Sequence, residues 1–301
     1  MKSSVNISHY YGLFSILLAA FLWGTTGTVA SLAPTLSPLA VGAAAMGGGG
    51  ILQAILARRQ IAQQINDIQS NLSILLVGVI AVVLYPLAFY SSMHLAGITI
   101  GTVVSMGTAP LFTAILERVF DKKRLSLTWF ISFILGVTGV ALLSIGESSH
   151  ISELDQNRES QKFIGLILGL VAGFTYALYS WSAKKLIERK IHSKAAMGTM
   201  FGGAALFLLP VLLITGDHIF SSNINLYVVG YMIFIPMFLG YVLFGYGLKT
   251  IDASKAITLT LFEPVVAAIF AITVVGESLN VLGWFGMGLI MICLLLLSKK
   301  A

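Results

Sequence analysis

The sequence predicts an all-α integral membrane protein with ten transmembrane helices, arranged as two inverted-topology repeats of five. Three observations lead to this fold: an apolar composition, ten apolar runs, and an uneven distribution of basic residues between the connections. Hydrophobic residues make up 57% of the 301-residue chain and charged residues only 10%, whereas a soluble domain carries about 25% charged residues. Too little polar surface remains to cover a globule in water, so the bilayer is the expected solvent.

The apolar runs approach the roughly 20 residues that a helix needs to cross a bilayer. The predicted spans are residues 11–32, 38–57, 71–92, 98–117, 126–145, 163–183, 195–215, 225–247, 253–274 and 279–298. The first run is too long for the apolar core of a signal peptide, and further runs follow it, so we interpret it as an uncleaved helix. Very short connections separate the third span from the fourth and the eighth from the ninth.

Basic residues cluster in alternate connections. If the N-terminus is cytoplasmic, only Arg158 and Lys162 of the 18 Lys and Arg residues lie on the outer side. This is the pattern of the positive-inside rule, and one missed or extra span would invert every later connection and destroy it. The sequence therefore predicts that both termini are cytoplasmic.

Several residues recur at a nearly constant offset of 153 to 155 positions. The matches are Phe21 and Trp23 with Phe174 and Tyr176, Pro110 with Pro264, and Trp129 with Trp284. They indicate an internal duplication, with a first repeat at 1–146, an acidic external linker at 147–161 and a second repeat at 162–301. Because five is odd, the second repeat would enter the membrane in the opposite direction, a construction found in many secondary transporters.

Short segments in the same order resemble the drug/metabolite transporter (DMT) superfamily, specifically its EamA-type members. They are Phe21–Gly24, Ala253–Ala256, Phe262–Pro264, Gly276–Leu279 and Gly283–Trp284. The resemblance implies ten helices around a central cavity, in a single-chain transporter for small organic solutes that are often exported. The first repeat departs from the pattern, with Thr108–Pro110 where the second has Phe262–Pro264, and with Lys122 and Lys123 near the position of Glu277. The halves are therefore not expected to contribute equally to a site.

Glu263 is the sharpest candidate, since it lies near the middle of the ninth span between Thr260 and Pro264. A charge at mid-membrane is costly, so such a residue usually faces a cavity or a partner. Glu263 could bind a proton for proton/cation coupling, or act as the counter-ion of a substrate amine. The structural alternative is that a protonated Glu263 repairs the hydrogen-bond defect that Pro264 creates in the helix.

The other candidate cavity-lining, substrate-binding residues are aromatic or hydroxyl-bearing. They are Trp23, Tyr85, Thr108, Tyr176 and Tyr241. Buried Trp and Tyr need a hydrogen-bond partner, which a substrate or a neighbouring helix could supply. Thr108 could instead bond back to its own helix.

Two prolines in matching spans, Pro110 and Pro264, are candidate hinges or fixed kinks. Glu117 with Arg118 at the cytoplasmic end of the fourth span is either an interfacial pair or part of an inner gate. The glycines at 47–50, and Gly165, Gly169 and Gly173, favour close helix packing. We interpret His94 as a solvated residue at the outer end of the third span.

No motif for a nucleophile elbow, a zinc protease, a nucleotide-binding loop or haem attachment occurs, and no Cys/His cluster suggests a metal or cofactor. Scattered basic residues argue against a nucleic-acid partner. We therefore expect no enzyme, but a secondary transporter of a small organic solute (an amino acid, an amine or a related metabolite) that works by alternating access. Resemblance favours export, from a bacterial inner membrane, and the chain is compatible with a monomer. A channel-like facilitator is the first alternative, and a membrane-embedded enzyme the second.

Overall fold

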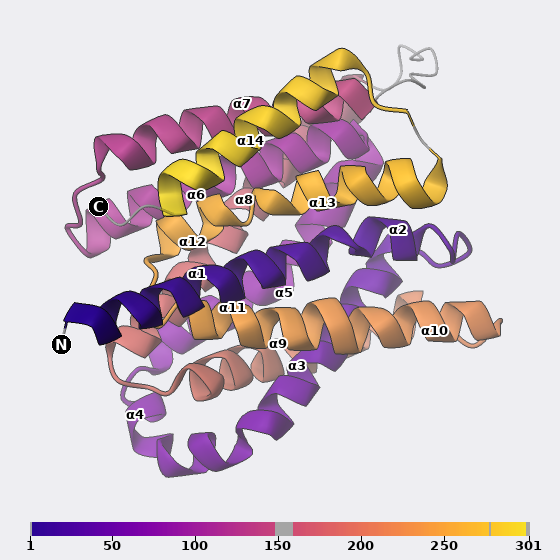
Figure 1. Cartoon of the computed structure of the whole chain (residues 1–301). Helices are drawn as coiled ribbons and strands as arrows, with labels where there is room; N and C mark the ends of the chain where they lie inside the picture. Colours follow the sequence, from indigo (N-terminus) through magenta and orange to yellow (C-terminus); the bar gives the residue numbers. More distant parts are fainter. Residues whose placement is uncertain (1, 148–158, 277, 299–301) are drawn as a thin grey trace.

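The computed structural model describes residues 2–147, 159–276 and 278–298, and no β-strand occurs in this part of the chain (Figure 1). Most of the predicted linker, and Glu277, lie outside the described residues. The elements are α1 Lys2–Gly24, α2 Thr26–Ala30, α3 Pro38–Gln63, α4 Ile65–Gln69, α5 Leu72–Ala96, α6 Ile98–Phe120, α7 Leu127–Glu147, α8 Glu159–Glu188, α9 Ser193–Thr215, α10 Asn223–Met232, the π-helical η2 Ile233–Gly240, α11 Tyr241–Gly247, α12 Ala253–Leu259, α13 Phe262–Phe270, the π-helical η3 Ala271–Val275 and α14 Val281–Ser298.

Ten helical stretches within the described residues are long and apolar enough to cross a bilayer, which confirms the predicted count. They are Ile7–Ala30, Pro38–Gln63, Leu72–Ala96, Gly101–Phe120, Leu127–Ile145, Ser160–Glu188, Ser193–Thr215, Asn223–Gly247, Ala253–Val274 and Val281–Ser298. The second stretch ends at Gln63 rather than at residue 57, and the sixth ends at Glu188 rather than at residue 183. Both helices continue into polar segments, which contain Arg58, Arg59 and Lys184.

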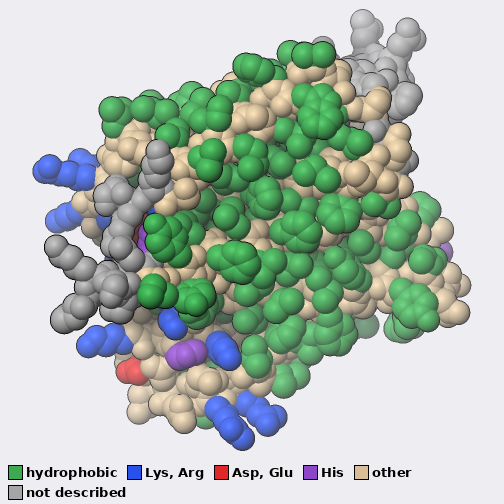
Figure 2. Space-filling model, in the orientation of Figure 1, with side chains coloured by type: hydrophobic (Ala, Val, Ile, Leu, Met, Phe, Trp, Pro, Cys, Tyr) green, Lys and Arg blue, Asp and Glu red, His purple; other side chains and the backbone are tan. Residues whose placement is uncertain are grey.

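The two ends of the bundle differ in charge. The start of α1 and the end of α14 lie at one end, at the left in Figure 1, and Lys and Arg side chains gather there in Figure 2. We call this the basic end, defined by connections 121–126, 189–192 and 248–252. The opposite end carries connections 31–37 and 216–222. Hydrophobic side chains cover the flank between them (Figure 2), as expected of a surface that faces lipid.

Helix packing follows the duplication. The most extensive contacts pair α3 with α9, α7 with α14, α5 with α8 and α6 with α8, while α1 packs on α11 and α13. When each span is exchanged with the span five places away, the α5–α8 contact maps onto α11–α1 and the α6–α8 contact onto α13–α1. The α3–α9 and α7–α14 contacts map onto themselves. Since α1 begins at the basic end and α8 ends there, the two five-helix halves run in opposite directions (Figure 1).

The connections at the two ends are set by local backbone chemistry. Gly97 alone joins α5 to α6 with φ +94°, a conformation that costs glycine little. The Oγ of Ser37 caps α3 by accepting a hydrogen bond from the Ala40 N–H at 3.1 Å, with Pro38 in the first turn. The short connection predicted between the third and fourth spans is therefore a turn at a single glycine.

The eighth and ninth spans are irregular, whereas their counterparts in the first half, α5 and α6, are continuous. In the ninth, α12 ends at Leu259 and α13 begins at Phe262, one position before Glu263. In the eighth, η2 contains Pro236. π-helical segments and interrupted helices are frequent at functional sites in membrane proteins, so the irregular spans mark where to look.

Candidate functional site

A cavity of about 620 Å³ lies in the half of the bundle nearer the opposite end. Its walls come from α1, α2, α3, α5, α6, the end of α7, α10 and α13. Exposed residues at the rim, Pro34, Pro38 and His94, show that it opens at that end. Along α5 the lining residues fall only in the last two turns, so the cavity does not extend to the basic end. Cavities of this volume commonly hold small organic ligands.

Glu263 and Trp23 lie in the wall of this cavity, together with Pro264. The Glu263 side chain is half-buried and receives no hydrogen bond from any side chain in the described residues. Its backbone N–H donates to the Thr260 carbonyl at 2.9 Å, which ties the start of α13 to the end of α12. The helix interruption therefore precedes Pro264 and presents the Glu263 carboxyl group to the cavity.

Trp23 is fixed from three sides. Its indole N–H donates to the Pro236 carbonyl in η2 at 2.9 Å, and its ring lies 4.8 Å from the Tyr241 ring, centroid to centroid. A Cβ added at Gly240 would lie 2.6 Å from Trp23 Nε1, so glycine is needed there for the indole to fit. Trp23 thus links the first span to the π-helical segment of the eighth.

Gly24 brings α1 against the Glu263 segment. A Cβ added at Gly24 would lie 2.6 Å from Val266 Cβ and 2.7 Å from the Glu263 carbonyl oxygen. The Phe21–Gly24 segment noted in the sequence therefore combines a cavity-lining indole with a close helix contact.

Replacing Gly24 with alanine should separate α1 from α13. We expect a loss of about 1–3 kcal/mol of stability, the usual cost of overpacking, seen as a lower Tm in detergent. Gly27 is the matched control, since no atom lies within 4 Å of a Cβ added there. A Gly24→Ala Tm equal to that of Gly27→Ala would contradict this packing.

An aromatic layer closes the cavity on the side of the basic end. The Tyr85 ring lies 5.3 Å from that of Tyr176 and 5.7 Å from those of Tyr179 and the cavity-lining Phe89. The Tyr179 hydroxyl is 2.9 Å from the Tyr241 hydroxyl, and the Tyr176 hydroxyl is 2.9 Å from Thr260 Oγ1. The candidates Tyr85, Tyr176 and Tyr241 are thus placed together beneath the cavity rather than in its wall.

Thr108 and Pro110 lie in α6, which stays helical through both positions. The Thr108 hydroxyl donates to its own helix, to the Val104 carbonyl at 2.6 Å. A Cβ at Gly173 would lie 2.2 Å from Thr108 Oγ1, so Thr108 faces α8 and not the cavity. Close packing at Gly169 and Gly165 follows the same stripe. The two candidate hinges differ, since the helix is interrupted just before Pro264 and not at Pro110; whether either bends in transport stays a prediction.

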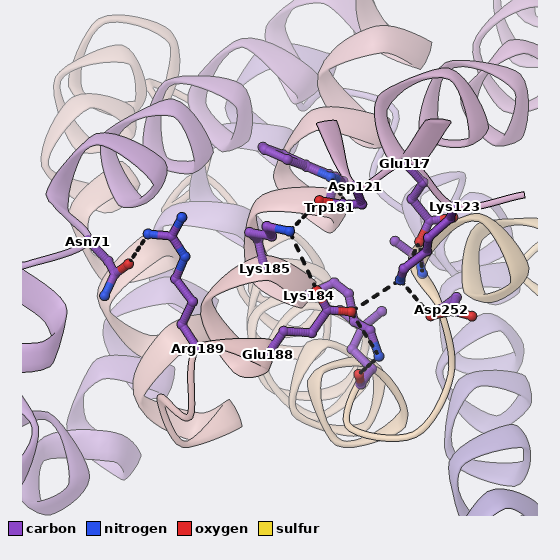
Figure 3. Close-up of polar contacts among 12 residues, drawn as sticks. Asn71, Glu117, Asp121, Lys123, Trp181, Lys184, Lys185, Glu188, Arg189 and Asp252 are labelled. Carbon is purple, nitrogen blue, oxygen red and sulfur yellow. Dashed lines mark hydrogen bonds and ion pairs between the residues drawn. The ribbon is translucent and has the colours of Figure 1, made fainter. Parts of the chain in front are cut away.

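Ion pairs join four segments at the basic end (Figure 3). Lys123 Nζ lies 2.7 Å from Asp252 Oδ1, 3.1 Å from Glu188 Oε1 and 3.4 Å from the buried Glu117 Oε1. Glu117 Oε1 also accepts the Ala253 N–H at 3.1 Å. Lys123, in the 121–126 connection, therefore joins the C-terminal ends of α6 and α8 to the N-terminal end of α12. We call Lys123, Glu117, Glu188 and Asp252 the ionic clasp.

Further contacts reinforce the ionic clasp (Figure 3). Lys185 pairs with Asp121, which also accepts the Trp181 indole N–H at 2.9 Å. Lys184 Nζ donates to the Leu248 carbonyl at 2.9 Å. Arg189 donates to Asn71 at the start of α5. The Glu117 that the sequence singled out thus pairs with Lys123, while Arg118 is exposed.

Burial and charge oppose each other at the clasp. Burial lowers the pKa of Lys123, but hydrogen bonds to Asp252 and Glu188 and the charge of Glu117 outweigh it, so the pKa is raised overall. Burial raises the pKa of Asp252, but the hydrogen bond and charge of Lys123 outweigh it, so the pKa is lowered overall. Both groups are therefore held in their charged forms at neutral pH.

These shifts predict a clasp that is insensitive to pH across the physiological range. A lowered Asp252 pKa gives stability that is present above its unfolded value of about 3.9 and is lost as pH falls further; a raised Lys123 pKa gives stability present below about 10.4 and lost as pH rises through the folded value. The Tm difference between wild type and Lys123→Met should stay constant between about pH 5 and pH 9. A difference that shrinks between pH 5 and pH 8 would contradict this assignment.

Four of the lining residues, Phe89, Tyr90, Met93 and Met106, were not predicted from the sequence, and a fifth, His94, was expected to be a solvated residue. On α5 the pairs 89 and 93, and 90 and 94, are four apart and share a helix face, a spacing that could have found them. The described residues contain no group of three or more His, Cys, Asp or Glu side chains that could hold a metal ion.

A bundle of membrane-spanning helices around a cavity that opens at one end is typical of a membrane transport protein. The EamA-like transporter family matches residues 10–145 and again residues 163–299, one match for each half. The chain belongs to this family.

The relatives support the same class. An uncharacterized transporter of Bacillus subtilis (strain 168), YwfM, is 32% identical over 291 residues, covering 96% of this chain and 93% of the relative. An uncharacterized inner membrane transporter of Salmonella typhimurium, YicL, is 24% identical with 95% of each chain covered. One solved structure has a TM-score of 0.76 at 15% identity, covering 98% of this chain and 96% of the other, which shows a shared fold.

Proposed function

We propose that this transporter is a secondary carrier that exports a small organic solute by alternating access. The observation that carries the proposal is a cavity of about 620 Å³ that reaches Glu263 from one end while the ionic clasp closes the other. The described lining residues include one acid, Glu263, and one imidazole at the rim, His94. The others are aromatic, hydroxyl-bearing, methionine, proline or small aliphatic residues, a set suited to binding rather than to bond cleavage. Glu263 is the proposed group for proton or cation coupling.

The closed basic end favours a carrier over a channel-like facilitator. Between the cavity and that end lie two layers, the aromatic layer around Tyr85 and Tyr176 and then the ionic clasp. A continuous pore would need both to be open in the resting state. Because the two halves pack with interchangeable contacts, an alternative state with the basic end open and the cavity mouth closed requires no new kind of helix interface.

The basic end is proposed to be cytoplasmic, with both termini on that side, in a bacterial inner membrane. Of the Lys and Arg side chains that the structure describes, only Lys162 lies at the opposite end, as the positive-inside rule would require. A relative named as an inner membrane transporter supports the membrane. In this orientation the cavity faces outward and the structure is the state that releases an exported solute.

Reconstitution into liposomes tests the proposal. Purified protein is expected to catalyse saturable uptake of a labelled solute and trans-stimulated counterflow, because a carrier returns faster when loaded. Candidate solutes would first be selected by their effect on the Tm of the protein. Flux that rises linearly with concentration and shows no counterflow would support the facilitator instead.

A further inference from the structure

The formal charge of the described cavity lining is negative. Glu263 is the acidic residue of the lining, and no Lys or Arg occurs among the described lining residues. The basic side chains instead lie mainly at the closed end (Figures 2 and 3). A solute carboxylate that entered the cavity would lose hydration without gaining a cationic partner, which is costly away from water. His94 lies at the exposed rim, where water already hydrates such a group.

The acid in the wall is available to a ligand. No described side chain donates a hydrogen bond to the Glu263 carboxyl group, and no Lys or Arg forms an ion pair with it. A cation stabilises a carboxylate at this depth far more than it would stabilise the same carboxylate in water. An ammonium group of the solute would supply both the charge and N–H donors.

The surrounding walls suit the rest of an organic cation. Trp23, Phe89 and Tyr90 line the same cavity as Glu263. Aromatic faces attract ammonium groups, and the Trp23 N–H is already bonded to Pro236, so Trp23 offers its ring rather than a donor. Three methionines, Met93, Met106 and Met232, complete the apolar lining and can adapt to bodies of different shape.

We propose that the cavity selects organic ammonium cations that carry no carboxylate, so that an amine binds in preference to the amino acid with the same side chain. The inference rests on the transport function proposed above and names the substrate class of the same site. It narrows the solute from amino acids and amines to amines, because a zwitterion brings an anionic group for which the described lining offers no Lys or Arg partner.

Two matched ligand series test it: tryptamine, tryptophan and indole-3-propionate, and phenethylamine, phenylalanine and 3-phenylpropionate. In each series the ring is constant and only the charged groups change. The amine should raise the Tm of the purified protein at concentrations at least about tenfold below those needed for the amino acid, as one unmatched charged group requires. The acid should have no effect. Equal or tighter binding of the amino acid, or no binding of either amine, would overturn the inference.

Variants connect the preference to the residues. Glu263→Gln should abolish the preference for the amine, whereas Asp217→Asn, which removes an exposed acid at the same end of the bundle, should leave it unchanged. Tyr90→Phe should retain amine binding, and Tyr90→Leu should weaken it by about threefold to tenfold. Retained selectivity in a folded Glu263→Gln protein would place the cation site elsewhere.

The two proposals fail separately. If the amines shift the Tm but no solute shows counterflow in liposomes, the proposed carrier function is wrong and the proposed ligand class still holds. If tryptophan or indole-3-propionate shows counterflow and the amines do not, the proposed ligand class is wrong and the proposed carrier function still holds.

Discussion

Replacing Glu263 with glutamine is expected to abolish solute movement driven by a proton gradient. Glutamine keeps the shape of glutamate but can neither take up a proton nor carry a charge. Hydrogen bonds to charged groups contribute about 1.5–3 kcal/mol, so the affinity for a cationic solute should also fall by about tenfold or more. The measurement is uptake into proteoliposomes across an imposed pH gradient, over a range of pH.

Controls separate Glu263 from its neighbours. The titratable groups that share its surroundings are Tyr90 and His94 in the cavity wall and Tyr85, Tyr176 and Tyr241 in the layer beneath. His94→Gln tests the contribution of the one imidazole among them, and Asp217→Asn tests the effect of removing an exposed acid. If Glu263 only repairs the helix interruption, Glu263→Gln will lower the Tm yet keep the wild-type pH profile of transport, and the coupling role is lost.

The spans could be predicted because each depends on a local property, an apolar run of about 20 residues. Their ends could not. At α8, Lys184 lies beyond the apolar run but stays helical, and its ammonium group reaches the Leu248 carbonyl in the 248–252 connection. This tertiary contact and an i,i+4 ion pair between Lys184 and Glu188 accompany the extension, and a search for apolar runs detects neither.

The candidate site was predicted where a residue is anomalous for its depth. Glu263 and Trp23 stand out in apolar runs, and both line the cavity. Tyr85, Tyr176 and Tyr241 stand out equally, yet they find protein partners beneath it. The Tyr85 ring contacts the Tyr176 ring, while Tyr176 hydrogen-bonds to Thr260 and Tyr241 to Tyr179. Sequence marks a buried polar group that needs a partner; it does not say whether the partner is another side chain or a solute.

The ionic clasp was beyond sequence reasoning for a different reason. The sequence groups Glu117 with its neighbour Arg118, as an interfacial pair or as part of an inner gate, and does not indicate Lys123 as its partner. In the structure the chain turns after α6 with Lys122 at φ +54°, and the Lys123 N–H donates to the Glu117 carbonyl at 3.2 Å. This C-terminal turn directs Lys123 back over the bundle, where it meets acids far away in the sequence.

Reversing the charge at Lys123 is expected to open the basic end. Lys123→Asp leaves Glu117, Glu188 and Asp252 without their shared cation and adds a fourth carboxylate. The pair with the exposed Asp252 contributes little by itself. Glu117 is buried, and removing the partner of a buried charge costs about 3–5 kcal/mol. A penalty of about 3 kcal/mol on the closed state would shift its population relative to an open state by about a hundredfold.

Thiol accessibility measures this shift. Cys293 is the single cysteine of the chain, so Cys293→Ala provides a cysteine-free background for Ser254→Cys, a buried position at the start of α12 beside the clasp. An impermeant maleimide applied to the basic end should label that thiol slowly in the parent protein and quickly after Lys123→Asp. Net transport should fall by about tenfold or more, since a carrier that rarely closes cannot complete its cycle.

Two further variants make the outcome specific to the clasp. Arg124→Asp reverses the charge of the next, exposed residue and should leave both labelling and transport near wild type. Adding Asp252→Lys to Lys123→Asp returns a cation beside Ala253, whose N–H already contacts Glu117, and should partly restore protection and transport. Rapid labelling in the Arg124→Asp protein, or none in Lys123→Asp, would mean that the basic end is closed by packing rather than by these charges.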